Sequence, residues 1–259
     1  IISVKLVSES GVGTIAAGVA KAKADLILIS GAEGGTGASP SSSIKHAGLP
    51  VEIGLAETQQ TLVMNNLRGK IRLQSDGQLK TGKDIIISAL LGAEEYGFAT
   101  SALIVLGCVM MRKCHMNTCP VGVATQNEEL RKRFLGRYEY LVNFFTFLAE
   151  DVREHLANLG FKTLDEAIGR ADLLKRKHFP EFPKTEKIDL SRITFVPKEA
   201  ETNALRKNAE QDHKLENILD RELISKSLPA LDLCMPVDFQ SKIKNTDRTT
   251  GAMLSGEIA

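Results

Sequence analysis

The sequence predicts an α/β fold in which parallel strands alternate with helices. Short apolar runs and amphipathic stretches alternate three times and a further apolar run follows, which is the order of right-handed βαβ units. The run Leu26–Ser30 is apolar at nearly every position, which indicates a strand buried on both faces, as in a parallel sheet. Glycine, aspartate, lysine and cysteine collect after the runs, where (β/α)8 barrels carry their active sites. Four strands make half of such a barrel, and an open doubly wound sheet is the competing architecture.

The expected elements of this sheet follow in order. Strands are predicted at Ile2–Val7, Leu26–Ser30, Lys70–Gln74 and Leu103–Leu106, and helices at Thr14–Ala24, Glu57–Arg68 and Lys83–Tyr96. Apolar residues spaced by three and four then predict helices at 128–134, Tyr138–Leu159 and Thr163–Lys175. Gly160 is the expected stop of the second, and Thr163 with Glu166 is the expected cap of the third. Phe144, Phe145 and Phe147 are expected to be core residues.

Composition sets the wider limits. Pro180 and Pro183 lie among charged residues and predict a boundary between 1–180 and 181–259. Beyond it, 199–222 reads as a charged, solvated helix. The net charge of +1 gives no reason to expect nucleic acid or an anionic membrane, and no apolar run approaches the roughly 20 residues of a membrane span. The chain starts without Met, so we expect it to be cut from a longer polypeptide.

Three of the four cysteines predict a metal centre. Cys108, Cys114 and Cys119 follow a C-x5-C-x4-C spacing, with Pro120 after the last. Clustered thiolates in one loop suit an iron–sulfur cluster, and three of them suggest a three-iron cluster or an open coordination position. A zinc site using His115 is the rival, although the usual C-x2-C pair is absent. A purely structural role is the third interpretation. The cysteine pattern indicates a reducing compartment rather than a disulfide framework.

Two loops and one lysine suggest a second ligand. Gly34, Gly35 and Thr36 would let a ligand approach the backbone, although such loops also simply turn corners. Asp76-Gly77, with a helix start near Gly82, is a candidate phosphate site. A lysine within a strand, Lys5, is costly unless it meets a charge or a ligand, although its stem can also lie along the surface. A phosphate-bearing cofactor beside a cluster favours a flavin, which couples two-electron to one-electron transfer.

These residues resemble the large (alpha) subunit family of the glutamate synthases. The likeness covers the whole chain and is carried by Val4–Asp25, Ser30–Pro40, Asp76–Gly82, Gly92–Thr100 and Cys108–Gln126. The tail, Asn245–Arg248 and Gly251–Glu257, is similar to the start of the family's C-terminal right-handed β-helix. Small departures occur at Ala32-Glu33 and Val51, where a more polar pair and an aromatic residue are expected.

The resemblance implies the architecture and the ligands. Residues 1–180 would be the second half of an FMN-binding (β/α)8 barrel with the iron–sulfur loop 108–119 and appended helices, and 181–259 a linker and the start of the β-helix. The family's [3Fe-4S] cluster falls on Cys108, Cys114 and Cys119, and its FMN on Lys5, Gly34, Gly35, Thr36, Asp76, Gly77, Gln78 and Gly107. In this assignment Lys5 and Thr36 lie beside the isoalloxazine ring, whereas Asp76, Gly77 and Gly107 lie near the ribityl phosphate.

The resemblance also implies an oxidoreductase. The family joins 2-oxoglutarate with glutamine-derived ammonia, and reduced FMN completes glutamate with electrons that pass through the cluster. Those electrons come from an NAD(P)H-oxidising partner subunit or from ferredoxin, in the cytoplasm or the plastid stroma. The catalytic residues fall mostly upstream, so the isolated chain is expected to be inactive and, with unpaired sheet edges, prone to aggregate. An N-methylglutamate-forming relative and a non-catalytic electron-transfer module are the alternatives.

Overall fold

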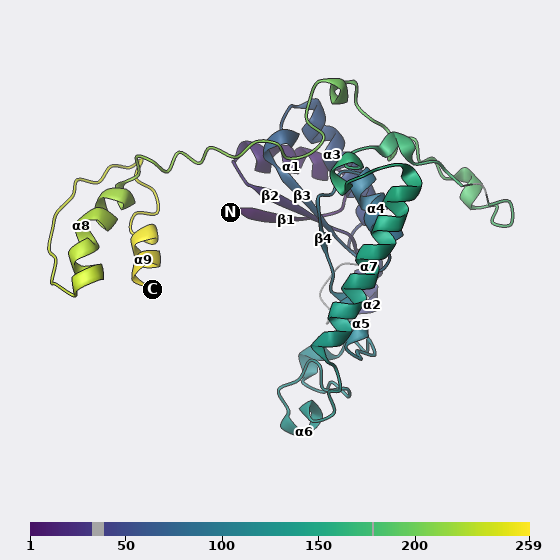
Figure 1. The fold of residues 1–259 in the computed structure, drawn as a ribbon, viewed down its shortest axis with the longest axis horizontal. Helices are drawn as coiled ribbons and strands as arrows, with labels where there is room; N and C mark the ends of the chain where they lie inside the picture. The colour runs from purple at the N-terminus through teal and green to yellow at the C-terminus, as the bar shows by residue number, and fades with distance from the viewer. Residues whose placement is uncertain (33–38, 178) are drawn as a thin grey trace. The chain divides into compact units, whose positions relative to one another are not determined.

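The computed structural model describes residues 1–32, 39–177 and 179–259 (Figure 1). The chain divides into two compact units, Ile1–Gln211 and Asp212–Ala259, and each is described by itself. The first unit extends past residue 180, and the division of the larger domains between 180 and 181 stays a prediction.

A parallel sheet forms the centre of the first unit. Its strands, in spatial and chain order, are β1 (Ser3–Val7), β2 (Leu26–Ser30), β3 (Arg72–Asp76) and β4 (Glu95–Gly97). The register places Lys5 opposite Leu28, Leu28 opposite Gln74, and Gln74 opposite Glu95. The predicted α/β class and parallel arrangement are therefore confirmed for the described residues, and all four strands end at one edge of the sheet.

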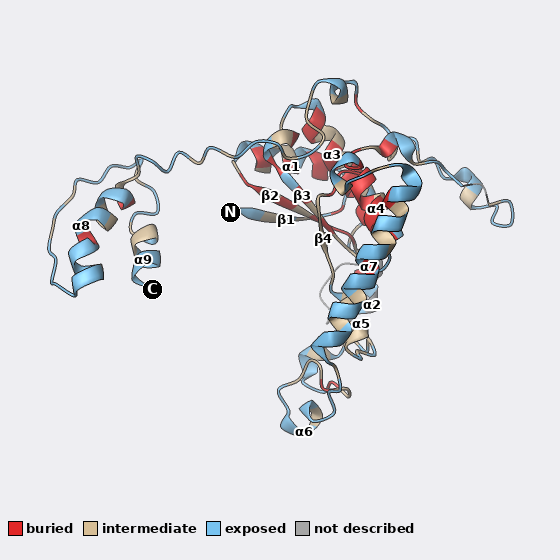
Figure 2. Cartoon of the chain, in the orientation of Figure 1, coloured by how far each residue is buried: buried red, intermediate tan, exposed pale blue. Residues whose placement is uncertain are grey.

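Among the described residues, helices cover one face of the sheet and leave the other open. Strand residues alternate between the faces, so Ile27, Ile29 and Leu73 lie fully buried against α1 (Val12–Lys21) and α3 (Val51–Met64). Red segments of the sheet and of α1 and α3 mark this buried layer in Figure 2. The opposite face carries Lys5, Gln74 and Glu95, which are half-buried or exposed. This division builds a core on one side and a polar surface on the other.

The fourth strand and the element after it differ from the prediction. Residues 103–106 were expected as a strand, but α5 (Thr100–Val105) is a helix and the fourth strand is β4. A short apolar run has no periodicity that distinguishes a strand from a helix. The expected helix 83–96 correspondingly ends early, as α4 (Gly82–Leu90), because Gly92 turns the chain at φ 115°.

The helix boundaries elsewhere are mixed. The helix α7 is Tyr138–Leu159, as predicted, and Gly160 ends it in the left-handed conformation at φ 81°. The helix α3 begins after Pro50, earlier than expected, and the short helix α2 (Ser41–His46) was not predicted. The expected helix at 163–175 is wrong, because this segment forms two 3-10 turns. The expected helix at 199–222 is wrong over most of its length: it starts as a 3-10 turn and continues irregularly, and only 219–222 belong to an α-helix.

The aromatic residues of α7 are not core residues in this chain. Phe147 is 72% exposed and Phe145 38% exposed, although Phe145 stacks edge-on with Phe98 at 5.3 Å between ring centroids. The buried face of α7 is further along, at Leu148 and Leu156. The helix packs on α4 there, whereas its first half extends toward α6 (Glu128–Arg131), where less of the chain covers it (Figure 1).

The segment 190–211 binds the sheet at the end where the strands begin. Arg68 is fully buried and donates to Gln59 Oε1 at 2.6 Å and to Glu94 Oε1 at 2.6 Å. The same Glu94 carboxylate accepts from the Lys207 amide at 3.2 Å, and Gln59 donates to the Leu205 carbonyl at 2.9 Å. A buried polar hub therefore ties a distant segment to the sheet, which explains why a charge is tolerated there.

The second unit contains α8 (Leu219–Leu233) and α9 (Ala252–Ile258). Asp220 lies buried and accepts from the amides of Gly251 at 2.6 Å and Met253 at 2.7 Å, which joins α8 to the start of α9. These backbone hydrogen bonds lower the pKa of Asp220. Of the residues expected to begin a β-helix, 252–257 lie in α9, whereas 245–248 lie in turns. Of the helices in the described residues, none is long and apolar enough to cross a membrane.

Candidate functional site

The predicted metal loop lies in a section that we call the cysteine lobe, residues 107–137. It follows α5 and contains one 3-10 turn, Cys114–Met116, and the short helix α6. Met110, Arg112 and Asn117 all adopt positive φ, at 55°, 57° and 57°. Left-handed conformations are uncommon for residues other than glycine and often accompany functional constraints. The lobe is therefore shaped by turns rather than by regular structure.

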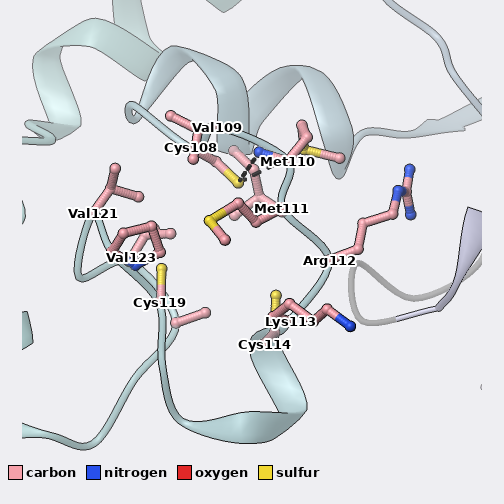
Figure 3. Close-up of a pocket in the computed structure, with 13 residues that line it drawn as sticks. Cys108, Val109, Met110, Met111, Arg112, Lys113, Cys114, Cys119, Val121 and Val123 are labelled. Carbon is pink, nitrogen blue, oxygen red and sulfur yellow. Dashed lines mark hydrogen bonds between the residues drawn. The ribbon is translucent and has the colours of Figure 1, made fainter.

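The three predicted ligands line one cavity. Cys108, Cys114 and Cys119 enclose a space of about 40 Å³ together with the apolar side chains of Val109, Met110, Met111, Val121 and Val123. Figure 3 shows the three sulfur atoms directed into this space from different parts of the loop. In Figure 3 the Arg112 side chain points away from this space. It donates to the Ser39 carbonyl at 3.5 Å. The loop thus gathers its thiols around one apolar pocket.

Backbone amides surround the most buried of these thiols. Cys119 is 8% exposed. Burial would raise the pKa of the Cys119 thiol, but hydrogen bonds from the amides of 121–124 outweigh burial and hold this pKa below its usual value. Gly122, at φ 74°, allows the turn that directs these amides. Successive amides in such a turn form an anion-binding concavity, as at many iron–sulfur sites.

The thiols of Cys108 and Cys114 are less buried than that of Cys119. The Met110 amide donates to Cys108 Sγ at 3.4 Å, and Cys114 lies half-buried at the start of its turn. Within the part of the chain that the structure describes, no three His, Cys, Asp or Glu side chains are grouped tightly enough to hold one metal ion. The cysteines therefore share a cavity without converging on a single point.

Hollows also lie between neighbouring strand ends. One of about 320 Å³ is lined by Lys5, Ser30 and Ser39, at the ends of β1 and β2. A second of about 240 Å³ lies between Gly31 and Gly77. A third of about 170 Å³ is lined by 76–79 and 97–100, after β3 and β4. The ends of parallel strands are where α/β proteins bind ligands.

An ion pair crosses the open face of the sheet at these hollows. Lys5 Nζ lies 3.0 Å from Asp76 Oδ2, with 56% of the Lys5 side chain and 19% of the Asp76 side chain exposed. The partly exposed Lys5 is therefore neither buried alone nor merely lying along the surface. Asp76 Oδ1 is buried and has no hydrogen-bond partner among the described residues. An acceptor oxygen in this state is costly unless a ligand donates to it.

The helix start near Gly82 was expected to bind phosphate, and its amides are already engaged. Lys80 and Thr81 donate to Asp84 Oδ2 at 3.0 and 2.9 Å, and Gly82 donates to Asp151 Oδ2 at 2.6 Å. These carboxylates make the start of α4 a capped terminus rather than an anion site. The loop after β4, residues 97–100, was missed because β4 itself was missed.

The remaining predicted residues are divided. Gly77 and Gln78 line the hollows, but Gly107 follows α5 and lines none of the three. Gly34, Gly35 and Thr36 lie outside the described residues, and so does Glu33 of the predicted departure. Arg112 is a residue that sequence reasoning left unassigned. The structure brings the three cysteines together and, separately, Lys5 with Asp76.

Comparison with known proteins identifies the family. Residues 1–162 match the model described as the conserved region in glutamate synthase. The chain is 53% identical to the glutamate synthase [NADPH] large chain of Bacillus subtilis, 53% identical to the glutamate synthase [NADH] of Schizosaccharomyces pombe, and 54% identical to the ferredoxin-dependent glutamate synthase of Cyanidium caldarium.

Each of these matches covers the whole chain but 17%, 12% and 17% of the respective relative. The chain thus spans less than a fifth of the length of these relatives. The match to the family model nevertheless extends over most of the chain and includes the cysteine loop and the strand-end loops. The chain belongs to the glutamate synthase family.

Proposed function

We propose that this chain is the part of a glutamate synthase that binds FMN and a [3Fe-4S] cluster. The enzyme would combine 2-oxoglutarate with glutamine-derived ammonia to give L-glutamate. The observation that carries the proposal is the shared cavity of Cys108, Cys114 and Cys119, in a chain of this family. The reaction as a whole requires parts of the polypeptide beyond these residues.

The cysteine cavity fits a cluster better than a single ion. A zinc ion holds each sulfur at about 2.3 Å, so its ligands must converge on one point. The three cysteines line one cavity without such convergence. A cluster distributes its metal positions, and its thiolate ligands can stand further apart. The amides around Cys119 favour the thiolate form that either metal needs. What supports the cluster is that the three thiols line one shared cavity.

The strand-end hollows fit a flavin nucleotide. The unpartnered Asp76 Oδ1 is an acceptor, and a ribityl chain carries hydroxyl donors. Gly97 lies beside Asp76 and lacks a side chain, and an added Cβ would lie 2.9 Å from Asp76 Cβ. Glycine at this position therefore leaves room next to the Asp76 carboxylate. If these strands are the last four of a (β/α)8 barrel, the hollow after β3 and β4 is where such barrels often hold phosphate. We assign Gly77, Gln78 and 97–100 to that end of the cofactor.

Lys5 and Asp76 would act on the cofactor through charge and position. The Lys5 ammonium would stabilise negative charge on a bound ring, and Asp76 holds that ammonium at 3.0 Å. FMN would supply hydride transfer, and the cluster would supply single electrons to it. The cysteine lobe would hold the cluster in a pocket lined mostly by apolar side chains.

The rest of the enzyme follows from the proposal. The first unit would be completed by further strands into a (β/α)8 barrel, and 181–259 would lead into the C-terminal β-helix. The electron donor is not fixed, because relatives of similar identity are named for NADPH, NADH and ferredoxin. We propose an NAD(P)H-oxidising partner or ferredoxin, in the cytoplasm or the plastid stroma.

The test is metal and flavin analysis of the complete glutamate synthase polypeptide, purified without oxygen. We expect about three irons per chain, the EPR signal of an oxidised three-iron cluster, and one FMN. Zinc without iron would overturn the cluster assignment. Iron without flavin would instead support a non-catalytic electron-transfer module.

A further inference from the structure

Asn117 occupies a special position in the cysteine lobe. It ends the 3-10 turn that carries Cys114 and lies two residues before Cys119. Its backbone is left-handed, at φ 57° and ψ 27°. Asparagine tolerates this conformation better than most residues because its short amide can bond locally. The backbone conformation of Asn117 therefore sets the direction of the chain between the turn Cys114–Met116 and Cys119.

A closed set of hydrogen bonds holds this turn against residues 125–127. The Thr125 hydroxyl lies 2.7 Å from Asn117 Oδ1 and 3.1 Å from the Asn117 carbonyl oxygen. The Gln126 amide donates to the same Asn117 Oδ1 at 2.7 Å, and the Asn127 amide donates to Thr125 Oγ1 at 3.1 Å. We call this set the Asn117–Thr125 clasp.

The clasp encloses the part of the loop that surrounds Cys119. Residues 117 and 125 are joined across Cys119 and the turn 121–124, in which the Gly122 amide donates to the Cys119 carbonyl at 3.2 Å. Few buried side chains are available to hold this turn, since Cys119 and Gly122 are the buried residues of the lobe, all of which is described. Hydrogen bonds must therefore supply the order that packing supplies elsewhere.

We propose that Asn117 and Thr125 are positioning residues that orient Cys119 and its surrounding amides toward the cluster. The inference rests on the proposed function, because it assigns the metal to these cysteines. Partners that orient ligands in this way normally change metal retention when they are removed. The clasp touches no substrate, so its effect reaches the reaction through Cys119 alone.

The experiment compares variants of the complete glutamate synthase polypeptide. Thr125→Val removes the hydroxyl at nearly constant volume, and Thr125→Ser restores it. Asn117→Gly removes the shared acceptor but keeps a residue that suits the left-handed backbone. Asn127→Ala is the matched control, because its Oδ1 caps α6 at Leu130 N, 3.1 Å away, while its backbone amide stays in the clasp.

The readouts are the rate at which a chelator removes iron and the EPR line shape and reduction potential of the oxidised cluster. We expect Thr125→Val and Asn117→Gly to lose iron about tenfold faster than the unaltered protein, with a shifted potential. Thr125→Ser and Asn127→Ala should stay within about twofold, because both variants leave the hydrogen bonds of the clasp in place.

Two outcomes would overturn the proposal. If both clasp variants lose iron at the unaltered rate and keep the unaltered potential, Asn117 and Thr125 do not position Cys119. If Asn127→Ala has an equal effect, the residues act only on the general stability of the lobe. Failure of the proposed function looks different, because the unaltered protein itself would then hold no three-iron cluster.

Discussion

The sheet module (β1–β4 with α1, α3 and α4) and the cysteine lobe are ordered by different means. The module has a continuous buried core that includes Ile27, Ile29, Leu55 and Leu73. The lobe has two buried residues, Cys119 and Gly122, among residues that are all described. Its exposed side chains include large apolar ones, such as Val109 at 58% and Leu135 at 83%.

The two regions should therefore differ in how far a bound group stabilises them. Apolar burial contributes roughly 25 cal/mol per Å² and needs no ligand, so the module has its own source of stability. A lobe without a core resembles small metal-dependent units, whose folding free energy comes from the metal. We therefore expect the lobe to depend on its cluster and the module to be insensitive to it.

The largest expected effect is the loss of the lobe on removing a thiol. Cys119→Ser should abolish the three-iron EPR signal, because a three-thiolate cluster loses one ligand. Without the cluster the lobe should be cut by protease at many sites within 107–137, while the sheet module stays resistant. Iron analysis and mapping of the first cleavage sites measure both effects.

The control for this prediction is Cys234→Ser. Cys234 is exposed and lies in the second unit, at the end of α8. Its replacement should leave iron content and cleavage pattern unchanged. If Cys119→Ser keeps its iron, or if module and lobe are cut at equal rates, the contrast between the two regions is wrong.

The sequence predicted those parts of the fold whose signal is local. The strand β2 is a continuous apolar run, and α7 combines a regular period with a glycine stop, so both have the predicted bounds. The strand β4 has three residues, Glu95–Gly97, and no apolar run. Its identity comes from pairing with β3, which is a long-range contact that no local pattern contains.

The same rule separates the parts of the candidate site. The cysteines were predicted because they are neighbours in sequence, and one short loop can bring them to a single cavity. The hollow that joins Asp76 to Thr100 was not predicted, since it depends on where β4 and α5 lie. The pairing of Lys5 with Asp76 was not predicted either. The two residues are 71 positions apart, and the register of β1 on β2 and of β2 on β3 brings them together.

The second prediction tests the module through its polar hub. Arg68→Met removes a guanidinium that is fully buried and bonded to Glu94, Gln59 and two carbonyls. We expect the free energy of unfolding to fall by about 3–5 kcal/mol, because the partners are left buried and unpaired. Urea denaturation, monitored by hydrogen exchange of amides in the module, measures this free energy.

The matched control is Arg72→Met on the same sheet. Arg72 also forms an ion pair, with Glu95 at 3.0 Å, but its side chain is 46% exposed. An exposed pair contributes about 0–1 kcal/mol, so this change should be small. Equal losses from the two variants would mean that burial of the hub is not what stabilises the module.

The third prediction concerns Gly122, where the cysteine turn of the lobe lies close to the backbone of the segment 130–134. A Cβ at Gly122 would collide with the Leu130 carbonyl oxygen and lie 3.0 Å from the Phe134 amide nitrogen. Gly122→Ala should destabilise the lobe by about 2–4 kcal/mol, from left-handed strain and the collision together. Hydrogen exchange within 119–134 measures it.

Gly160→Ala separates the two causes. Gly160 has a similar φ of 81°, but an added Cβ meets nothing within 4 Å. It should therefore cost about 1–2 kcal/mol, which is the strain alone. Gly122→Ala matching Gly160→Ala would show that the segment 130–134 moves freely away from the cysteine turn.

The fourth prediction has the least effect and concerns Tyr96, which should make the stability of the sheet module fall at alkaline pH. Burial, with the charges of Glu94 and Asp165, raises the pKa of Tyr96, whose hydroxyl donates to the Ala93 carbonyl at 2.9 Å. The folded state keeps this proton after the unfolded state, with a pKa of about 10, has lost it. The contribution of Tyr96 to stability is therefore complete below about pH 10 and declines above it, by up to about 1.4 kcal/mol per pH unit.

Tyr96→Phe isolates this contribution. At pH 7 the variant should be about 1 kcal/mol less stable, because one hydrogen bond is lost. Phenylalanine has no proton to release, so the gap should close as the pH rises above about 10. Urea denaturation at pH 7, 9 and 11, which lie on either side of a pKa of about 10, measures how the free energy of unfolding of each protein changes with pH. A gap that stays constant with pH would mean that Tyr96 ionises as easily in the folded module as in the unfolded chain. In that case the module would be as open to water near β4 as the cysteine lobe is, and the contrast between the two regions would fail at that strand.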